Sequence, residues 1–131
     1  MFVFAEAAIS GMRAAQGMLQ ASAHNVANAN TPGYKRLVAS TQESPNSAGV
    51  ELRVTRDESP GTVLPARTSL DDDVYSPPTG VGSAPMFVEG SNVDLATELV
   101  NVSQAATYYQ AMASVVARGD DMAGTLLDAF A

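Results

Sequence analysis

The C-terminal stretch 91–131 carries two neighbouring apolar stripes at helical spacing. The first advances in steps of three and four and consists of Leu95, Leu99, Val102, Ala106, Tyr109, Ala113, Val116, Ala123, Leu127 and Phe130, with Asp120 as its polar exception. The second runs beside it and consists of Ala105, Tyr108, Met112, Val115, Met122 and Leu126. This heptad rhythm predicts a long helix that needs a partner helix. A helix that is apolar over two adjacent stripes is not expected to stand alone on a small monomer.

The N-terminal stretch 2–29 predicts a second long helix. It contains no Pro, although Gly11 and Gly17 lower its helix propensity. Its apolar positions follow the same rhythm and are Phe2, Ala5, Ile9, Met12, Leu19, Ala23 and Val26, with Gln16 as the polar exception. We expect this stripe to cover the first stripe of the C-terminal helix.

Two arrangements of these helices are compatible with the stripes. In the simpler one they form a two-helix coil within one chain, closed by the middle of the sequence. In the other, both helices also pack against further copies, which the second stripe favours because one partner covers only one seam. We assign helix packing to Ile9, Met12, Leu19, Leu95, Leu99, Val102, Tyr109, Val116 and Leu127. We assign contacts between subunits to Tyr108, Met112, Val115, Met122 and Leu126.

The stretch 24–36 predicts the end of the first helix and a tight turn. Thr31-Pro32-Gly33-Tyr34 is typical of a type II turn, in which Pro presets the first central position and Gly supplies the positive φ of the second. Asn25 lies on the predicted helix, and its neighbours Asn28 and Asn30 can hydrogen-bond to the backbone where the helix ends. Spacing alone favours a helix stop and turn, with His24 solvated or packed rather than a ligand.

The middle segment, 34–90, predicts a small β piece with long loops. Residues 50–56 alternate cleanly and predict a strand, while 34–39, 86–89 and the short fragment 62–64 are weaker candidates. Six of the seven prolines fall between Pro45 and Pro85. The stretch 65–85 is expected to be mobile or held only by neighbours. The acidic run 71–73 is expected to be a solvated loop, because it lacks the Gly and distal Glu of a calcium loop.

The sequence also predicts how the final helix is capped and where it bends. Ser91 or Asn92 is expected to cap it, with Asp94 favourable in its first turn. Gly119-Asp120 could bend it. The fold class is therefore mainly α: long N- and C-terminal helices paired as a coiled coil, with a small β-hairpin and long loops between. The corresponding units are 1–33, 34–90 and 91–131.

Composition and motifs exclude several functional classes. The net charge is −7 without a visible basic patch, so we expect no nucleic-acid partner. The chain has no Cys and one His, and it lacks a catalytic triad motif, a phosphate loop and a metal-ligand spacing. We therefore expect no enzyme activity, no metal and no cofactor. No apolar run is long enough for a transmembrane segment, and the N-terminus does not resemble a cleavable signal.

Two separated motifs resemble those of bacterial flagellar rod and hook proteins. SAHNVANANTPGYKR, at 22–36, is similar to the N-terminal signature of this family. EGSNVDLATELVN, at 89–101, is similar to its second shared segment, which opens the terminal helix. Together with the helices around them, they cover roughly half of the chain. The opening of the second motif most resembles the proximal rod proteins of the FlgC type. The direct 31–34 turn departs from that type and resembles the other rod proteins, and the stretch 106–110 departs from the Arg-Ala-Tyr pattern common in the family.

The resemblance implies a structural subunit of the proximal rod of the flagellar basal body. In that family the terminal helices form an inner coiled-coil layer, and copies stack into a helical axial tube that transmits torque and surrounds the export channel. The implied partners are other copies, other rod proteins and the flagellar export apparatus, and the implied location is the periplasmic rod, reached without a cleaved signal. The resemblance also implies an assembly motif, which consists of Asn25, Val26, Asn28, Asn30, Thr31, Pro32, Gly33 and Tyr34. The alternative is a cytoplasmic helical adaptor or export-associated protein of the flagellar system.

Overall fold

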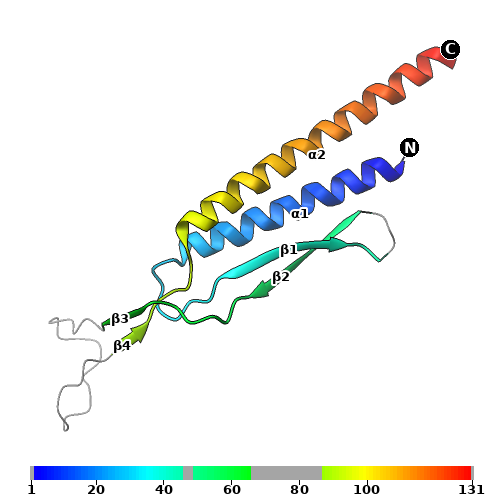
Figure 1. Ribbon diagram of the computed structural model, residues 1–131. Helices are drawn as coiled ribbons and strands as arrows, with labels where there is room; N and C mark the ends of the chain where they lie inside the picture. The colour runs from blue at the N-terminus through cyan, green and yellow to red at the C-terminus, as the bar shows by residue number, and fades with distance from the viewer. Residues whose placement is uncertain (1, 46–48, 66–86, 131) are drawn as a thin grey trace, which may run out of the picture.

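The computed structural model describes residues 2–45, 49–65 and 87–130 (Figure 1). In chain order, its elements are α1 (Phe2–Ala27), β1 (Leu37–Glu43), β2 (Val50–Arg56), β3 (Val63–Pro65), β4 (Phe87–Glu89) and α2 (Leu95–Phe130). The two helices and the small antiparallel sheets confirm the mainly helical prediction with a β-hairpin in the middle. The expectations for mobility between residues 66 and 85 and for the acidic loop 71–73 fall outside the described residues.

The two helices lie side by side and run antiparallel (Figure 1). Asn25 of α1 is hydrogen-bonded to Glu98 of α2 near one end of the pair, and Gly11 lies against Met112 further along. Because α1 has 26 residues and α2 has 36, the C-terminal end of α2 projects past the N-terminus (Figure 1). α2 continues as one helix through Gly119, so Gly119-Asp120 does not interrupt it.

The buried apolar residues of the two helices are all small. The buried apolar residues are Ala8, Ala14, Ala15 and Ala21 on α1 and Ala105 on α2. A Cβ added to Gly11 would lie 3.0 Å from Cγ of Met112, so the Gly at this position is what lets the helices come this close. The seam therefore follows an Ala- and Gly-rich face of α1.

This seam corrects the sequence-based assignment of helix packing within one chain. Ile9 and Leu19 on α1 are exposed, and Met12 is only half-buried. The larger members of the first α2 stripe, Leu95, Leu99, Tyr109 and Leu127, are exposed, while Val102 and Val116 are half-buried. The α2 face toward α1 draws on both stripes: Ala105 is buried and Met112 lies against Gly11, while Val102 and Val116 of the first stripe are half-buried. The prediction followed the spacing of large side chains, whereas close approach of two backbones selects small ones.

The β1–β2 hairpin packs on α1, which lies between the hairpin and α2 in the view of Figure 1. Leu52 of β2 covers Gly17, where a Cβ would collide with its side chain. Gly49, with a φ of 117°, brings the start of β2 onto Ala7 and Ser10, and the Val50 N–H donates to Ser10 Oγ at 3.1 Å. Local glycines thus place the hairpin on the helix.

The strands match the sequence-based expectations with shifted bounds. The strand predicted at 50–56 is confirmed as β2, and it pairs in antiparallel register with β1, from Leu37↔Arg56 to Glu43↔Val50. β1 begins three residues later than the predicted 34–39 strand and ends at Glu43. Before it, the Tyr34 hydroxyl bonds to Asn25 and the Arg36 N–H bonds to Asn92 rather than to β2. The two weakest candidates form the short β3–β4 pair, with Leu64↔Val88 at its centre.

Candidate functional site at the junction of the helices and the hairpin

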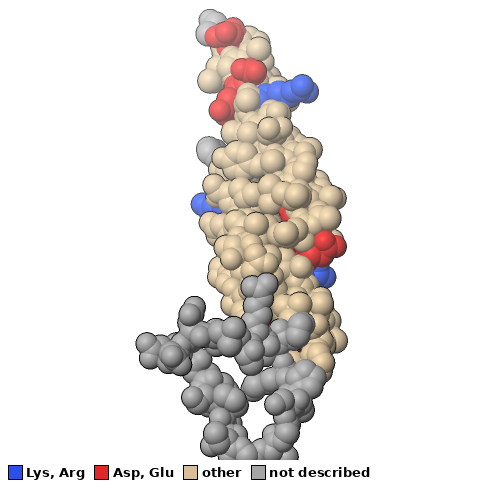
Figure 2. Space-filling view, turned by 90° about the vertical axis from the view of Figure 1, so that its left-hand side faces the viewer, with Lys and Arg blue, Asp and Glu red and all other residues tan. Residues whose placement is uncertain are grey.

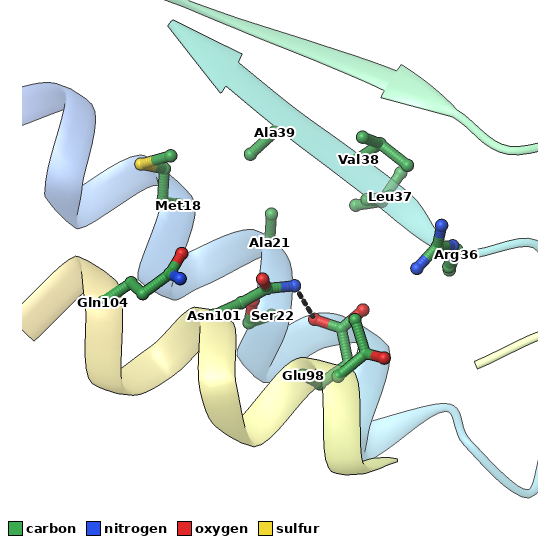
Figure 3. Close-up of a pocket in the computed structure, with 11 residues that line it drawn as sticks. Met18, Ala21, Ser22, Arg36, Leu37, Val38, Ala39, Glu98, Asn101 and Gln104 are labelled. Atoms are coloured by element: carbon green, nitrogen blue, oxygen red, sulfur yellow. Dashed lines mark hydrogen bonds between the residues drawn. The ribbon is translucent and has the colours of Figure 1, made fainter. Parts of the chain in front are cut away.

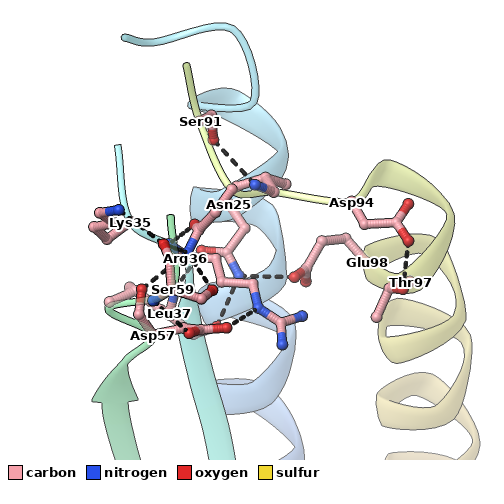
Figure 4. A network of polar contacts seen from close by, with 12 residues as sticks. Asn25, Lys35, Arg36, Leu37, Asp57, Ser59, Ser91, Asp94, Thr97 and Glu98 are labelled. Atoms are coloured by element: carbon pink, nitrogen blue, oxygen red, sulfur yellow. Dashed lines mark hydrogen bonds and ion pairs between the residues drawn. The ribbon is translucent and has the colours of Figure 1, made fainter. Parts of the chain in front are cut away.

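Asn25 is the centre of a junction where α1, α2 and β1 meet (Figure 4). It is 0% exposed, and its carboxamide makes four hydrogen bonds. Oδ1 accepts from the Leu37 N–H at 2.7 Å and from the Tyr34 hydroxyl at 2.9 Å. Nδ2 donates to the Leu37 carbonyl at 2.8 Å and to Glu98 Oε1 at 3.0 Å. Since a backbone N–H can only donate, these partners also determine which way the amide faces.

Glu98 is the charged member of the junction and is 1% exposed. Its Oε1 accepts from Asn25, and its Oε2 accepts from Asn101 Nδ2 at a longer 3.4 Å. A buried carboxylate is costly unless it is hydrogen-bonded, so these two amides are what make its position tolerable. A cavity of about 260 Å³ lies beside it, between α1, β1 and α2, with Met18 and Ala21 on its walls (Figure 3).

Tyr34 joins the turn to this junction. Its hydroxyl donates to Asn25 and lies 2.8 Å from His24 Nδ1, so Nδ1 must carry the proton and donate to Tyr34. Burial raises the pKa of the Tyr34 hydroxyl, with Arg56 opposing this shift and the Glu98 carboxylate adding to it. His24 is exposed and acts here as a hydrogen-bond donor at the end of α1.

The turn itself forms as the sequence predicts. The Tyr34 N–H donates to the Thr31 carbonyl at 3.2 Å, and Gly33 has a φ of 68°, as a type II turn requires. A Cβ at Gly33 would meet no atom within 4 Å, so the requirement for Gly is conformational rather than steric crowding. The Gly33 N–H donates to the Glu89 carbonyl at 2.8 Å, which ties the turn to β4.

The other residues of the predicted assembly motif lie at the surface of this region. Asn28 is half-buried, and its Nδ2 donates to the His24 carbonyl at 2.9 Å. Val26, Asn30, Thr31 and Pro32 are exposed. The structure therefore gathers Asn25 and Tyr34 into the buried junction and leaves most of the motif facing outward.

A second group of polar contacts surrounds the start of β1 (Figure 4). Arg36 Nε pairs with Asp57 Oδ2 at 2.8 Å, and this bond, together with bonds from Ser59, lowers the pKa of Asp57 to about 2. Lys35 pairs with Glu89 at 2.7 Å and lowers the pKa of that carboxyl, helped by the Gly61 N–H.

Asn92 and Asp94 have different roles from those expected. Asp94, rather than Ser91 or Asn92, caps α2: its Oδ1 accepts from the Ala96 N–H at 2.9 Å, and its Oδ2 accepts from the Thr97 hydroxyl at 2.9 Å. These bonds lower the pKa of Asp94, and the bond from the Thr97 hydroxyl has the largest effect. Asn92 instead turns toward the hairpin, where Arg36 N–H donates to its Oδ1 at 2.7 Å.

Sequence reasoning missed Glu98 and Asn92 as members of this site. Glu98 lies between Leu95 and Leu99 of an apolar stripe and resembles an ordinary exposed acid of a helix's first turn. Its one signal was its place inside the second motif, 89–101. Among the described residues, no cluster of His, Asp and Glu side chains could hold a metal ion. The arrangement of the junction joins segments rather than performing chemistry.

Two family models match the chain around this junction. The model described as "Flagella basal body rod protein" matches residues 6–35, and the model described as "Flagellar basal body rod FlgEFG protein C-terminal" matches residues 85–129. The two matches together cover more than half of the chain and place both sequence motifs in the same family.

The chain belongs to the flagellar basal-body rod protein family. This rod protein is accordingly a structural component of the flagellum that serves motility, it associates with other rod proteins, and it is not an enzyme. A comparison with curated proteins finds no match. The FlgC type remains a prediction, since neither model distinguishes it. Within the described residues, no helix combines the length and the apolar character needed to cross a bilayer.

Proposed function

We propose that this rod protein is a self-assembling subunit of the proximal rod, whose terminal helices pair as a coiled coil and build a helical axial tube. The observation that carries the proposal is the apolar surface that α2 leaves exposed. Leu99 and Leu127 of the first stripe are 65% and 72% exposed, and Met122 of the second is 63% exposed. Contiguous exposed apolar residues rimmed by polar ones mark sites of protein–protein interaction.

The position of these residues supports contacts between copies. Tyr108, Val115, Met122 and Leu126, assigned to subunit contacts, are exposed, although Met112 is half-buried against Gly11 of the same chain. The exposed residues of the first α2 stripe extend this apolar surface to a second face of the helix. We now propose both as surfaces for neighbours, because α1 covers neither completely.

The two helices differ in ways that favour an open assembly. α1 offers Ile9, Leu19 and Val26 as exposed apolar residues, while α2 offers a longer surface that continues past the N-terminus. When two different surfaces of one chain meet, the contact repeats head to tail and produces rings or helical filaments. A helical tube that transmits torque and surrounds a channel is an assembly of this kind.

The distribution of charge is consistent with such packing. On the face shown in Figure 2, Lys, Arg, Asp and Glu occupy small areas, and uncharged residues cover most of the described surface. Charged residues are depleted at the core of protein interfaces. Our proposal includes the periplasmic rod as the location and passage through the flagellar export apparatus without a cleaved signal, both of which rest on membership of the family.

Substitutions on exposed stripe residues test the proposal. Leu99→Asp and Leu127→Asp place a charge where a neighbour is proposed to pack, and an unpaired buried charge is costly. We expect cells carrying either variant to lose swimming and to lack complete rods in images of isolated basal bodies. Because both side chains are exposed in the single chain, the purified variants should keep the parental helix content.

The matched control is Ser114→Asp, which adds the same charge on the exposed polar face of α2. It should swim like the parent. Normal swimming in both Leu variants would refute the assembly surface. Intact rods in cells that lack the protein altogether would instead favour the cytoplasmic adaptor.

A further inference from the structure

At the open end of the hairpin, where β1 begins and β2 ends, some backbone N–H and C=O groups have no partner on the opposite strand. In an antiparallel ladder, residues alternate between pairs that exchange two backbone bonds and pairs whose N–H and C=O groups point away from each other. The Asp57 N–H donates to the Arg36 carbonyl at 2.9 Å, so Arg36 and Asp57 are a pair of the first kind. It follows from the register that Leu37, opposite Arg56, directs its N–H and C=O out of the ladder.

Asn92 occupies the missing half of the Arg36–Asp57 pair. A regular ladder would join the Arg36 N–H to the Asp57 carbonyl directly. Here the Arg36 N–H donates to Asn92 Oδ1 at 2.7 Å, and Asn92 Nδ2 donates to the Asp57 carbonyl at 2.9 Å. The carboxamide is thus inserted between the two strands and behaves as a peptide group would. Nδ2 also reaches the Ser59 carbonyl at 3.1 Å.

The Asn25 side chain likewise takes the place of a backbone partner, on the outer edge of β1. Its Oδ1 and Nδ2 exchange two hydrogen bonds with the N–H and C=O of Leu37, as a residue of a third strand would. The remaining N–H of the carboxamide donates to Glu98 on α2. An unpaired strand edge is normally covered or blocked, and here a side chain of α1 pairs with the first residue of that edge.

We propose that Asn25 and Asn92 are positioning residues that substitute for strand neighbours and thereby fix the orientation of the hairpin relative to both helices. Asn25 belongs to α1, and Asn92 lies in the segment that leads into α2, so the first residues of β1 are held from two sides by the two helices. The two helices are also in contact at Gly11 and Met112 and through the bond from Asn25 to Glu98, neither of which involves Asn92. Loss of Asn92 should therefore release the hairpin and α2 from each other while the helices remain paired.

Spin-label distances in the purified chain test this inference. Because the chain has no Cys, labels attach only at introduced sites. The pair Ser40→Cys and Ser103→Cys reports the distance from hairpin to α2, and the pair Gln16→Cys and Ser103→Cys reports the distance between the helices; all three positions are exposed. Asn92→Asp keeps the acceptor for Arg36 but loses the donor for the Asp57 carbonyl.

We expect Asn92→Asp to lose the single narrow hairpin-to-α2 distance at neutral pH while the helix-to-helix distance is unchanged. Acidification to about pH 4 should restore the narrow distance in part of the molecules, because about half of ordinary Asp carboxyls are protonated there and a protonated carboxyl regains a donor. The charge control is Gln42→Glu, at an exposed hairpin position, which should keep the parental distances.

An unchanged hairpin-to-α2 distance in Asn92→Asp at neutral pH would overturn the proposal. If that variant does not fold, Asn92→Ala removes the same bonds without adding a charge. Loss of the helix-to-helix distance in both variants would also overturn it, because Asn92 would then be needed for folding rather than for placing the hairpin. This measurement uses the single chain, so its outcome is independent of whether the rod assembles as proposed.

Discussion

The two ends of the helix pair differ in whether a single chain provides partners for its own side chains. At the junction end, Asn25 and Glu98 are buried, and among the described residues no buried side-chain nitrogen or oxygen atom lacks a hydrogen-bond partner. At the other end, α2 extends past α1, and Met122, Leu126, Leu127 and Phe130 are exposed. The buried polar groups of the junction find their partners within a single chain, whereas the apolar residues of the far end, like Leu99 beside the junction, stay exposed in it.

This difference separates folding from assembly along one helix. Hydrogen bonds at the junction are directional and determine how the segments are oriented, but they bury little apolar area. The exposed side chains of the far end contribute little to the fold of one chain and can contribute much when a neighbour buries them. Variants at the two ends should therefore affect different measurements.

The largest effect on stability is expected from Asn25→Ala. The substitution leaves the Leu37 N–H and C=O and the Glu98 carboxylate without their partner in a buried place, and groups of this kind cost about 1–3 kcal/mol each. We expect the free energy of unfolding to fall by about 3 kcal/mol or more. Urea unfolding followed by circular dichroism measures this change.

Asn30→Ala is the matched control, because Asn30 is exposed and its side chain makes no hydrogen bond to the described residues. It should change the free energy of unfolding by less than about 0.5 kcal/mol. An Asn25→Ala loss as small as that of the control would contradict the central role of the junction.

Hydrogen exchange should show the same difference between the two ends of α2 in the unsubstituted chain. In the dilute single chain, we expect slow exchange between residues 98 and 112, which face α1, and fast exchange from residue 118 onward, since an unpacked helical segment opens readily. In assembled rods, exchange from residue 118 onward should also become slow. Strong protection of 118–130 in a proven monomer would mean that this end needs no neighbour.

The smallest effect is expected from the half-buried ion pair of Asp57 with Arg36. Its pKa in the folded chain is about 2, below its ordinary value of 3.8, so the folded state favours the charged carboxylate. Its contribution to stability is therefore complete above pH 3.8 and is lost as the pH falls toward 2. Glu89 and Asp94, whose pKa values are also lowered, change stability in the same direction.

Asp57→Asn should make the free energy of unfolding lower at pH 5 and less dependent on pH below it. Urea midpoints at several acid pH values provide the measurement. Glu58→Gln, which removes a neighbouring exposed carboxylate that has no ion pair among the described residues, should keep the parental pH dependence. If the two variants showed the same pH dependence of the free energy of unfolding, the ion pair of Asp57 would not be the cause of that dependence.

Much of the local structure could be predicted from residue patterns. Both long helices, the strand at 50–56 and the positive φ of Gly33 follow from periodicity and turn chemistry, which are properties of neighbouring residues. The bounds of β1 could not be predicted, because Asn25 and Asn92 hold its first residues through bonds from distant segments.

The sequence by itself determined the elements, the turn and the membership of the rod family, because local spacing and two motifs carry that information. Only the tertiary structure decided which face of each helix meets the other. Periodicity locates large apolar residues, but the antiparallel contact selects Ala and Gly, and the bond between Asn25 and Glu98 sets the rotation of one helix against the other. The large residues consequently face outward, where they are available to other subunits.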